Sequence, residues 1–184
     1  MSTWRISCTL LLVLAFASSP MFGASERKKA ASRAEIDAIA ADSLDRLFEN
    51  RPKARRLYDN ASGYAVFSNI KVSLVITGGG GRGVAVTKGG DRTYMKMATG
   101  GLNLGLGGQK YQVVFLFEDP QTLDRFINEG WEAEGSANAV AGNKGANVAP
   151  TFRNGVALFQ MTQGGLMLQV DISGTKYWQS NLNR

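Results

Sequence analysis

The chain has 184 residues, of which 44% are hydrophobic and 20% are charged, and its formal net charge is +6 at neutral pH. A chain of this size and composition is long enough to fold around one hydrophobic core. It contains no histidine, and its single cysteine is Cys8. Catalysis by Ser-His-Asp or Cys-His groups, zinc sites built from imidazole or thiolate, and a disulfide within the chain are therefore excluded.

The first 24 residues have the layout of a secretory signal peptide. Arg5 supplies a positive charge, residues 6–17 are mostly Leu, Val, Phe and Ala, and Pro20 follows. This apolar run is short for crossing a bilayer. Cys8 lies inside the run instead of after it, which argues against a lipoprotein signal. We therefore expect cleavage near Ala24 and a periplasmic or secreted protein; an uncleaved N-terminal anchor is the alternative.

Residues 25–60 are expected to form a helical arm. The apolar residues of this segment recur at steps of three and four, which places them on one helix face. They are Ile36, Ile39, Ala40, Leu44, Leu47 and Phe48. Ser32 and Glu35 have capping-box spacing, which predicts a helix start at Ser32. Because the residue before proline avoids the α region, Arg51-Pro52 should end this helix, and a second short helix is predicted over residues 53–58.

Beyond Asn60 the hydrophobic period changes to two, which indicates strands separated by glycines. The predicted strands are residues 63–68, 72–77, 83–88, 93–98, 102–106, 111–118, 137–141, 156–162, 166–171 and 175–178. Gly89-Gly90 and Gly164-Gly165 are suited to two-residue hairpin turns. Residues 113–117 are apolar throughout, which is typical of a central strand covered on both faces.

One helix is predicted within the sheet. Asp119 is its expected N-cap, Pro120 its first residue, and Gly130 its end. The predicted fold class is therefore α+β, with N-terminal helices packed on a mainly antiparallel, glycine-punctuated β-sheet or barrel-like sheet with one inserted helix. The expected organisation is a signal peptide over residues 1–24, the helical arm over 25–60, and a β-rich domain over 61–184 that forms a single globular unit with the arm.

Two glycine clusters resemble phosphate-binding loops. Gly78, Gly80 and Gly83 satisfy G-x-G-x-x-G, but a predicted strand follows where a dinucleotide site requires a helix. We therefore interpret this run as a tight turn with close backbone contacts. In the second cluster Gln109 separates Gly108 from Lys110, and Tyr111 stands where a Walker loop has Ser or Thr. We expect neither a cofactor nor a metal.

An enzyme without histidine and cysteine remains one hypothesis. Glu132 and Glu134 have strand spacing and would share one face, and Lys110 could serve as a reactive amine. Exposed charges are also common beside glycines such as Gly130. Trp131 could form a ligand platform, although an aromatic residue at a helix exit more often fills a core.

Basic residues at both ends of the first helix are the more informative pattern. They are Arg27, Lys28, Lys29, Arg33, Arg51, Lys53, Arg55 and Arg56. Each cation near an anionic membrane contributes about 1 kcal/mol to binding, and the apolar helix face could add insertion if it is not packed on the sheet. The alternative is that this face covers the sheet and the cations are merely solvated. Nucleic acid is not an expected partner, because these cations are not interleaved with stacking aromatic residues.

Several segments resemble the SYLF domain family, and more closely its exported bacterial branch. They are residues 61–67, the glycine run 78–84, residues 105–109 leading into 113–117, residues 123–126 followed by Gly130-Trp131, and residues 164–167 through 173–176. Together they extend from about residue 35 to residue 178. The hairpin at residues 91–98 lacks the Trp/Pro pattern expected of the family.

The resemblance implies a compact α+β domain without catalysis that binds anionic lipid through an N-terminal amphipathic segment and basic residues. Eukaryotic members bind phosphoinositides, and some are described as actin-binding. For an exported bacterial chain the corresponding ligands would be phosphatidylglycerol, cardiolipin or lipid A phosphates. The alternative function is a protein–protein interaction or self-associating envelope module without a lipid ligand.

Overall fold

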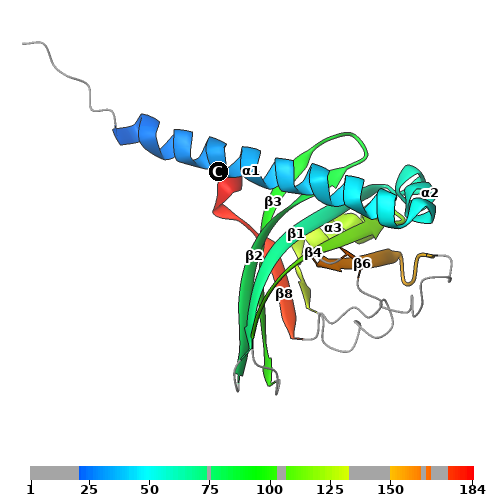
Figure 1. Ribbon diagram of the computed structural model, residues 1–184. Coiled ribbons are helices and arrows are strands. Elements are labelled where there is room, and N and C mark those ends of the chain that lie inside the picture. The colour runs from blue at the N-terminus through cyan, green and yellow to red at the C-terminus, as the bar shows by residue number, and fades with distance from the viewer. Residues whose placement is uncertain (1–20, 74–75, 103–106, 133–149, 163–164, 167–173) are drawn as a thin grey trace, which may run out of the picture.

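The computed structural model describes residues 21–73, 76–102, 107–132, 150–162, 165–166 and 174–184 (Figure 1). Several predictions fall outside these ranges. They are the apolar run of the predicted signal peptide, the predicted strand at 137–141, most of the predicted strands at 102–106 and 166–171, and the positions of Glu134 and Gly164.

Two helices precede the sheet, as expected, but the first is longer than its predicted range. α1 spans Met21–Asn50 and α2 spans Pro52–Asn60. The predicted start at Ser32 is wrong: Ser32 lies inside α1, and its hydroxyl accepts a hydrogen bond from Arg82 at 2.8 Å instead of capping the helix. The predicted break at Arg51-Pro52 is confirmed, with Arg51 in a non-helical conformation and Pro52 as the first residue of α2.

The strands form one open, antiparallel sheet. They are β1 (Gly63–Ser73), β2 (Ile76–Thr87), β3 (Arg92–Leu102), β4 (Gly107–Phe117), β5 (Trp131–Glu132), β6 (Val156–Thr162), β7 (Gly165–Leu166) and β8 (Thr175–Gln179). Their order in the sheet is β5-β8-β3-β2-β1-β4-β6-β7, and each described pair of neighbours is antiparallel. The α+β prediction is confirmed, and in the described strands the sheet does not close into a barrel.

The glycine run is part of a strand, which corrects the interpretation of a tight turn. Residues 78–83 lie within β2 and pair with residues 67–72 of β1. A Cβ on Gly81 would lie 2.3 Å from the backbone oxygen of Ser68, and one on Gly83 would lie 2.2 Å from that of Val66. Glycine is therefore needed here because the backbones of β1 and β2 approach closely. The predicted close backbone contacts are confirmed, whereas the predicted turn is not.

The helix inserted in the sheet agrees with the sequence prediction. α3 spans Pro120–Asn128, and the Asp119 carboxylate accepts a hydrogen bond from the Thr122 backbone N–H at 2.8 Å. Gly130 has a φ of 76°, which favours glycine after the helix end. A hairpin joins β2 and β3 as predicted, but its turn covers residues 88–90 instead of the two residues expected at Gly89-Gly90. The Thr87 backbone N–H donates to the Asp91 backbone oxygen at 3.0 Å, and Gly90 has a φ of 95°.

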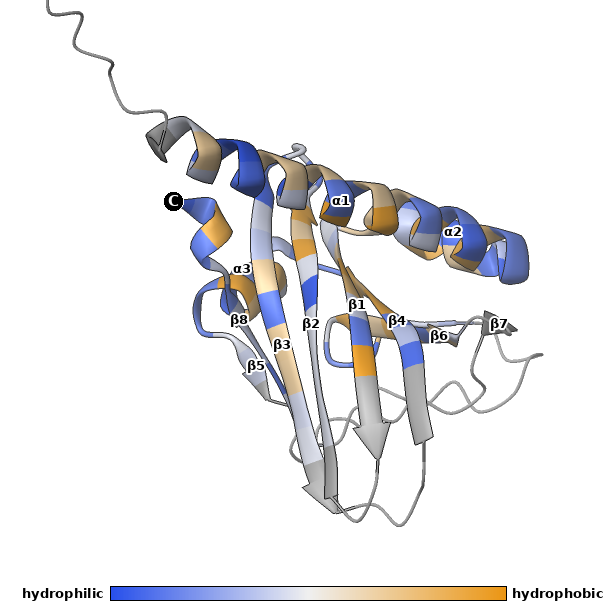
Figure 2. Cartoon of the chain, turned by 60° about the vertical axis from the view of Figure 1, so that its left-hand side comes forward, coloured by the Kyte–Doolittle hydropathy of each residue, from blue (hydrophilic) through white to orange (hydrophobic). Residues whose placement is uncertain are grey.

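Helices cover both faces of the sheet, so the core has two parts. On one face α1 packs on side chains that include Val66, Val84, Val114 and Leu116. On the other face α3 packs against Phe67, Phe115 and Phe117. β4 lies between β1 and β6 and contributes to both parts, which explains why residues 113–117 are apolar throughout. Figure 2 shows α1 crossing the strands near one end, with β1, β2, β3 and β4 continuing beyond it.

Trp131 belongs to the second part of the core. Its ring lies 5.5 Å from Phe115 and 5.7 Å from Tyr177, measured between ring centroids. Of the two interpretations, the geometry supports a partly buried core residue at the helix exit.

Candidate functional site

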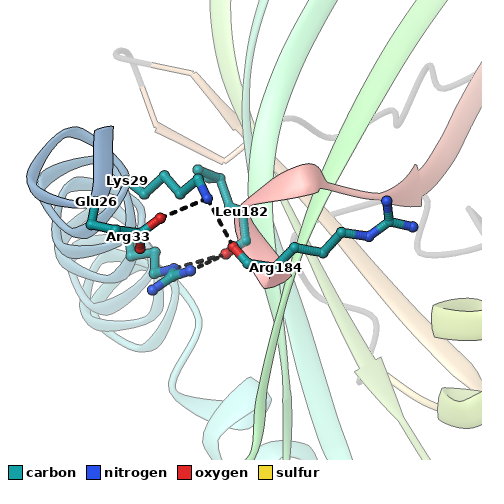
Figure 3. A network of polar contacts seen from close by, with 5 residues as sticks. All are labelled: Glu26, Lys29, Arg33, Leu182 and Arg184. Atoms are coloured by element: carbon teal, nitrogen blue, oxygen red, sulfur yellow. Dashed lines mark hydrogen bonds and ion pairs between the residues drawn. The ribbon is translucent and has the colours of Figure 1, made fainter. Parts of the chain in front are cut away.

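The predicted cations at the N-terminal end of α1 fall into two pairs. Arg27 and Lys28 are exposed to solvent. Lys29 donates to the Glu26 carboxylate at 2.8 Å and to the backbone oxygen of Arg184 at 3.1 Å. Arg33 donates through Nε to the backbone oxygen of Leu182 at 2.8 Å, and its Nη2 donates to the same oxygen (Figure 3). Arg27 and Lys28 are thus exposed for an external ligand, whereas Lys29 and Arg33 are engaged within the chain.

The segment that holds Lys29 and Arg33 is itself attached to the sheet. It contains the short 3-10 helix η1 (Asn181–Asn183). Asn183 Oδ1 accepts from the Tyr94 backbone N–H at 2.8 Å, and Asn183 Nδ2 donates to the Tyr94 backbone oxygen at 3.0 Å. The Arg33 guanidinium also lies 5.9 Å from the centre of the Tyr94 ring. Residues 181–184 therefore connect β3 to the N-terminal half of α1.

The electrostatics at this end of α1 favour the ionised form of Glu26. The hydrogen bond from Lys29 and the positive charge of Lys29 lower the pKa of the exposed Glu26 carboxyl. The pKa of the Tyr94 hydroxyl shifts in the other direction: burial and the hydrogen bond to Asp37 raise it, which favours the neutral hydroxyl. At neutral pH Glu26 therefore compensates one of the nearby cations, and Arg27 and Lys28 provide the positive surface.

The predicted cations around the turn between α1 and α2 differ from one another in exposure and in their contacts. Arg51 is only 8% exposed, so it is part of the folded structure and not of an open surface. Arg55 pairs with Asp59 at 3.3 Å, and its guanidinium lies 4.9 Å from the centre of the Phe48 ring. Lys53 and Arg56 are exposed.

The structure does not bring the eight predicted cations into one site. At 1.5 Å per helical residue, Arg27 and Asn50 lie about 35 Å apart along α1. The exposed side of the helix between the two groups carries the acidic residues Asp42, Asp45 and Glu49. The two groups of cations are therefore separate surfaces, with exposed acidic residues of α1 between them.

The apolar face of α1 is packed on the sheet. Ile36, Ala40, Leu44 and Leu47 are between 0% and 7% exposed, and Phe48 is partly buried against the same cluster. The alternative that this face covers the sheet is confirmed, and membrane insertion of the face would require α1 to detach. None of the helices in the described ranges combines the length and the apolar character that crossing a bilayer demands.

The two described residues that were candidates for catalysis, Lys110 and Glu132, lie on different strands that are not neighbours in the sheet. Lys110 is an exposed residue of β4. Glu132 belongs to β5, which lies at one edge of the sheet, and Glu134 is outside the described residues. In the part of the chain that the structure describes, no group of three or more acidic or cysteine side chains is arranged to hold a metal ion.

A crevice between α1 and the sheet was not foreseen from the sequence. It has a volume of about 430 Å³, and its lining includes Ile36, Ile39, Val66, Ile70, Arg82 and Lys110. Strand alternation is the signal that could have identified it, because residues two apart on β1 face the same side. A turn over residues 78–82 gives Arg82 no strand face, so the sequence interpretation does not place its side chain beside Ile70.

No family model matches the chain. It is similar to beta cell expansion factor A of Aeromonas veronii, with 45% identity over 148 residues, which are 80% of this chain and 57% of that protein. The chain thus spans little more than half the length of this curated relative. The resemblance to the SYLF family stays a prediction.

Proposed function

We propose that the chain is a non-enzymatic domain that docks on anionic phospholipid through the N-terminal end of α1. The observation that carries the proposal is the pair of exposed cations Arg27 and Lys28, on a helix end that extends past the sheet (Figure 1). Lys29 and Arg33 lie within the next two turns and could join them on leaving Arg184 and Leu182. The resemblance to lipid-binding SYLF domains supports the same ligand class.

The docking is electrostatic, since the apolar face of α1 is packed in the core. At about 1 kcal/mol for each cation, Arg27 and Lys28 alone give about 2 kcal/mol, and all four cations give about 4 kcal/mol. The larger value corresponds to a dissociation constant of about 1 mM. The domain would therefore bind reversibly and depend on the density of anionic lipid.

The test is co-sedimentation of the purified protein with vesicles of phosphatidylcholine, with and without phosphatidylglycerol. We expect binding only to the anionic vesicles. The double variant R27Q/K28Q should weaken it about 30-fold, because two cations are lost. The matched control K53Q/R56Q removes the same charge from α2, beyond the other end of α1, and should have a much smaller effect. Equal losses in both variants, or binding to pure phosphatidylcholine, would contradict the proposal.

The place of action in this proposal is the bacterial periplasm or the exterior. The leader-like residues 1–24 support export, and the anionic lipids available there include phosphatidylglycerol and cardiolipin. Mass spectrometry of the protein recovered from the exported fraction would identify its N-terminus, which we expect close to Ser25. A protein that stays in the cytoplasm with Met1 intact would contradict this part.

A protein-binding or self-associating envelope module is the second candidate. The covered apolar face of α1 favours it, because membrane insertion by this face is blocked in the folded chain. Crosslinking in the envelope followed by light scattering of the purified protein separates the two functions. Partner capture or self-association that is independent of anionic lipid would favour the second candidate.

A further inference from the structure

The crevice between α1 and the sheet is lined on both sides by apolar side chains, and no described side chain fills the space above Gly80. Its volume of about 430 Å³ lies in the range of small-molecule sites. Ile36 and Ile39 of α1 face Val66 and Ile70 of β1 across it. Gly80 leaves the floor open, since a Cβ there would meet only the backbone oxygen of Met97, at 3.7 Å.

Ile70 places a large exposed apolar side chain in this crevice. It is 51% exposed, and it and Trp178 are the large apolar side chains that stand exposed in the described part of the chain. Apolar surface that faces water in a hollow gains free energy when another apolar group covers it. The wall of the crevice therefore favours an apolar ligand.

Positive charge borders the same hollow. Lys110 of β4 lies directly opposite Ile70 in the register, and both side chains line the crevice. Arg82 of β2 also lines it, and Lys96 of β3 lies directly opposite Arg82. Like charges in opposite positions of neighbouring strands repel each other, so an anion bound beside them would be stabilised.

The cations are poorly compensated by the chain itself. Arg82 donates to the Ser32 hydroxyl at 2.8 Å and pairs with Glu35, which also lines the crevice, at 3.3 Å. Both side chains of this ion pair are about half exposed, which makes the pair weak. Among the described residues, neither Lys96 nor Lys110 has an ion-pair partner. The border of the crevice thus keeps a net positive charge next to an apolar wall.

We propose that this crevice binds a single-chain anionic amphiphile of the fatty-acid type. Its carboxylate lies between Lys110 and Arg82, and its chain lies against Ile36, Ile39, Val66 and Ile70. The volume is near the lower end of the range for ligand sites, which fits one chain better than a two-chain phospholipid. This site is separate from Arg27 and Lys28 and goes beyond the proposed docking on membranes.

The test is calorimetric titration of the protein with three probes: decanoate below its micelle concentration, 1-decanol and acetate. Decanoate carries both the chain and the charge, whereas decanol lacks the charge and acetate lacks the chain. We expect saturable binding of decanoate, at least tenfold weaker binding of decanol, and none of acetate. Decanol and decanoate of equal affinity, or no saturable binding of decanoate, would overturn the proposal.

Matched variants locate the site. G80L places a side chain in the crevice and should abolish decanoate binding, whereas G78L, on the same strand with open space around its Cβ, should not. K110Q should weaken decanoate about tenfold, and K53Q should leave it unchanged. Decanoate binding by G80L as tight as that by G78L would contradict the site.

The same variants keep the two proposals distinguishable. G80L should still sediment with anionic vesicles, since Arg27 and Lys28 are untouched. R27Q/K28Q should still bind decanoate. Absence of binding to anionic vesicles by the unmodified protein would refute the proposed function alone, and absence of decanoate binding by the unmodified protein would refute the crevice proposal alone.

Discussion

Gly83 has no room for a side chain, because a Cβ there would lie 2.2 Å from the backbone oxygen of Val66 and 2.4 Å from the Phe67 ring. We expect G83A to lower the free energy of unfolding by about 1–3 kcal/mol, the usual cost of overpacking. The matched control is G78A, whose Cβ would meet no atom within 4 Å. Denaturant titration measures both, and equal stability of the two variants would contradict the close approach of β1 and β2.

Asp119 makes the stability of α3 sensitive to acid. Hydrogen bonds from the backbone N–H and the hydroxyl of Thr122 lower the pKa of the Asp119 carboxyl. A lowered folded-state pKa means that its stabilisation is present above the unfolded-state pKa and is lost as the pH falls through the folded-state pKa. We expect D119N to be less stable than the parent at neutral pH, with the difference shrinking in strong acid. A pH-independent difference in denaturant titrations would contradict this role.

At the scale of single elements, the pattern of α1 predicted its apolar face but not its start. The Ser32/Glu35 capping box suggested a boundary, yet alanine-rich sequence on both sides continues the helix to Met21. Ser32 and Glu35 instead contact Arg82 of β2. The capping-box rule considers only neighbouring residues, so it could not predict that Ser32 and Glu35 contact Arg82, which is far away in the sequence.

The packing of α1 on the sheet should dominate its energetics. Leu47 is fully buried beneath the helix, so L47A should lower the free energy of unfolding by about 2–5 kcal/mol. I70A is the matched control, because Ile70 is 51% exposed and its truncation should change stability by no more than about 0.5 kcal/mol. Thermal or chemical unfolding of both variants checks this. A small effect of L47A would indicate that α1 is not firmly attached.

Residues 181–184 should restrain the cations of α1. A chain that ends at Ser180 loses the backbone oxygens that hold Lys29 and Arg33. With two more cations available, its binding to anionic vesicles should increase up to about 30-fold. Its stability should fall, since Tyr94 loses both hydrogen bonds to Asn183. In the background R33Q/K29Q the truncation should no longer increase binding, and an increase there would contradict the restraint.

At the scale of the whole molecule, sequence patterns predicted the α+β fold, the central strand β4, the α1–α2 break and the capped helix α3. These features follow from local rules of periodicity, proline and capping. The site was harder to predict, because it depends on which distant segments meet. The burial of Arg51 and the contact of Arg33 with Leu182 arise only in the folded chain. The acidic residues Asp42, Asp45 and Glu49 are visible in the sequence, and the folded helix exposes them between the two cation groups.

The most direct test of electrostatic docking is the salt dependence of binding to vesicles that contain phosphatidylglycerol. Because exposed charges are screened over about 10 Å at 0.1 M salt and about 3 Å at 1 M, the bound fraction should fall steeply across this range. It should recover when the salt is removed by dialysis. A bound fraction that stays constant across the titration would contradict docking through Arg27 and Lys28.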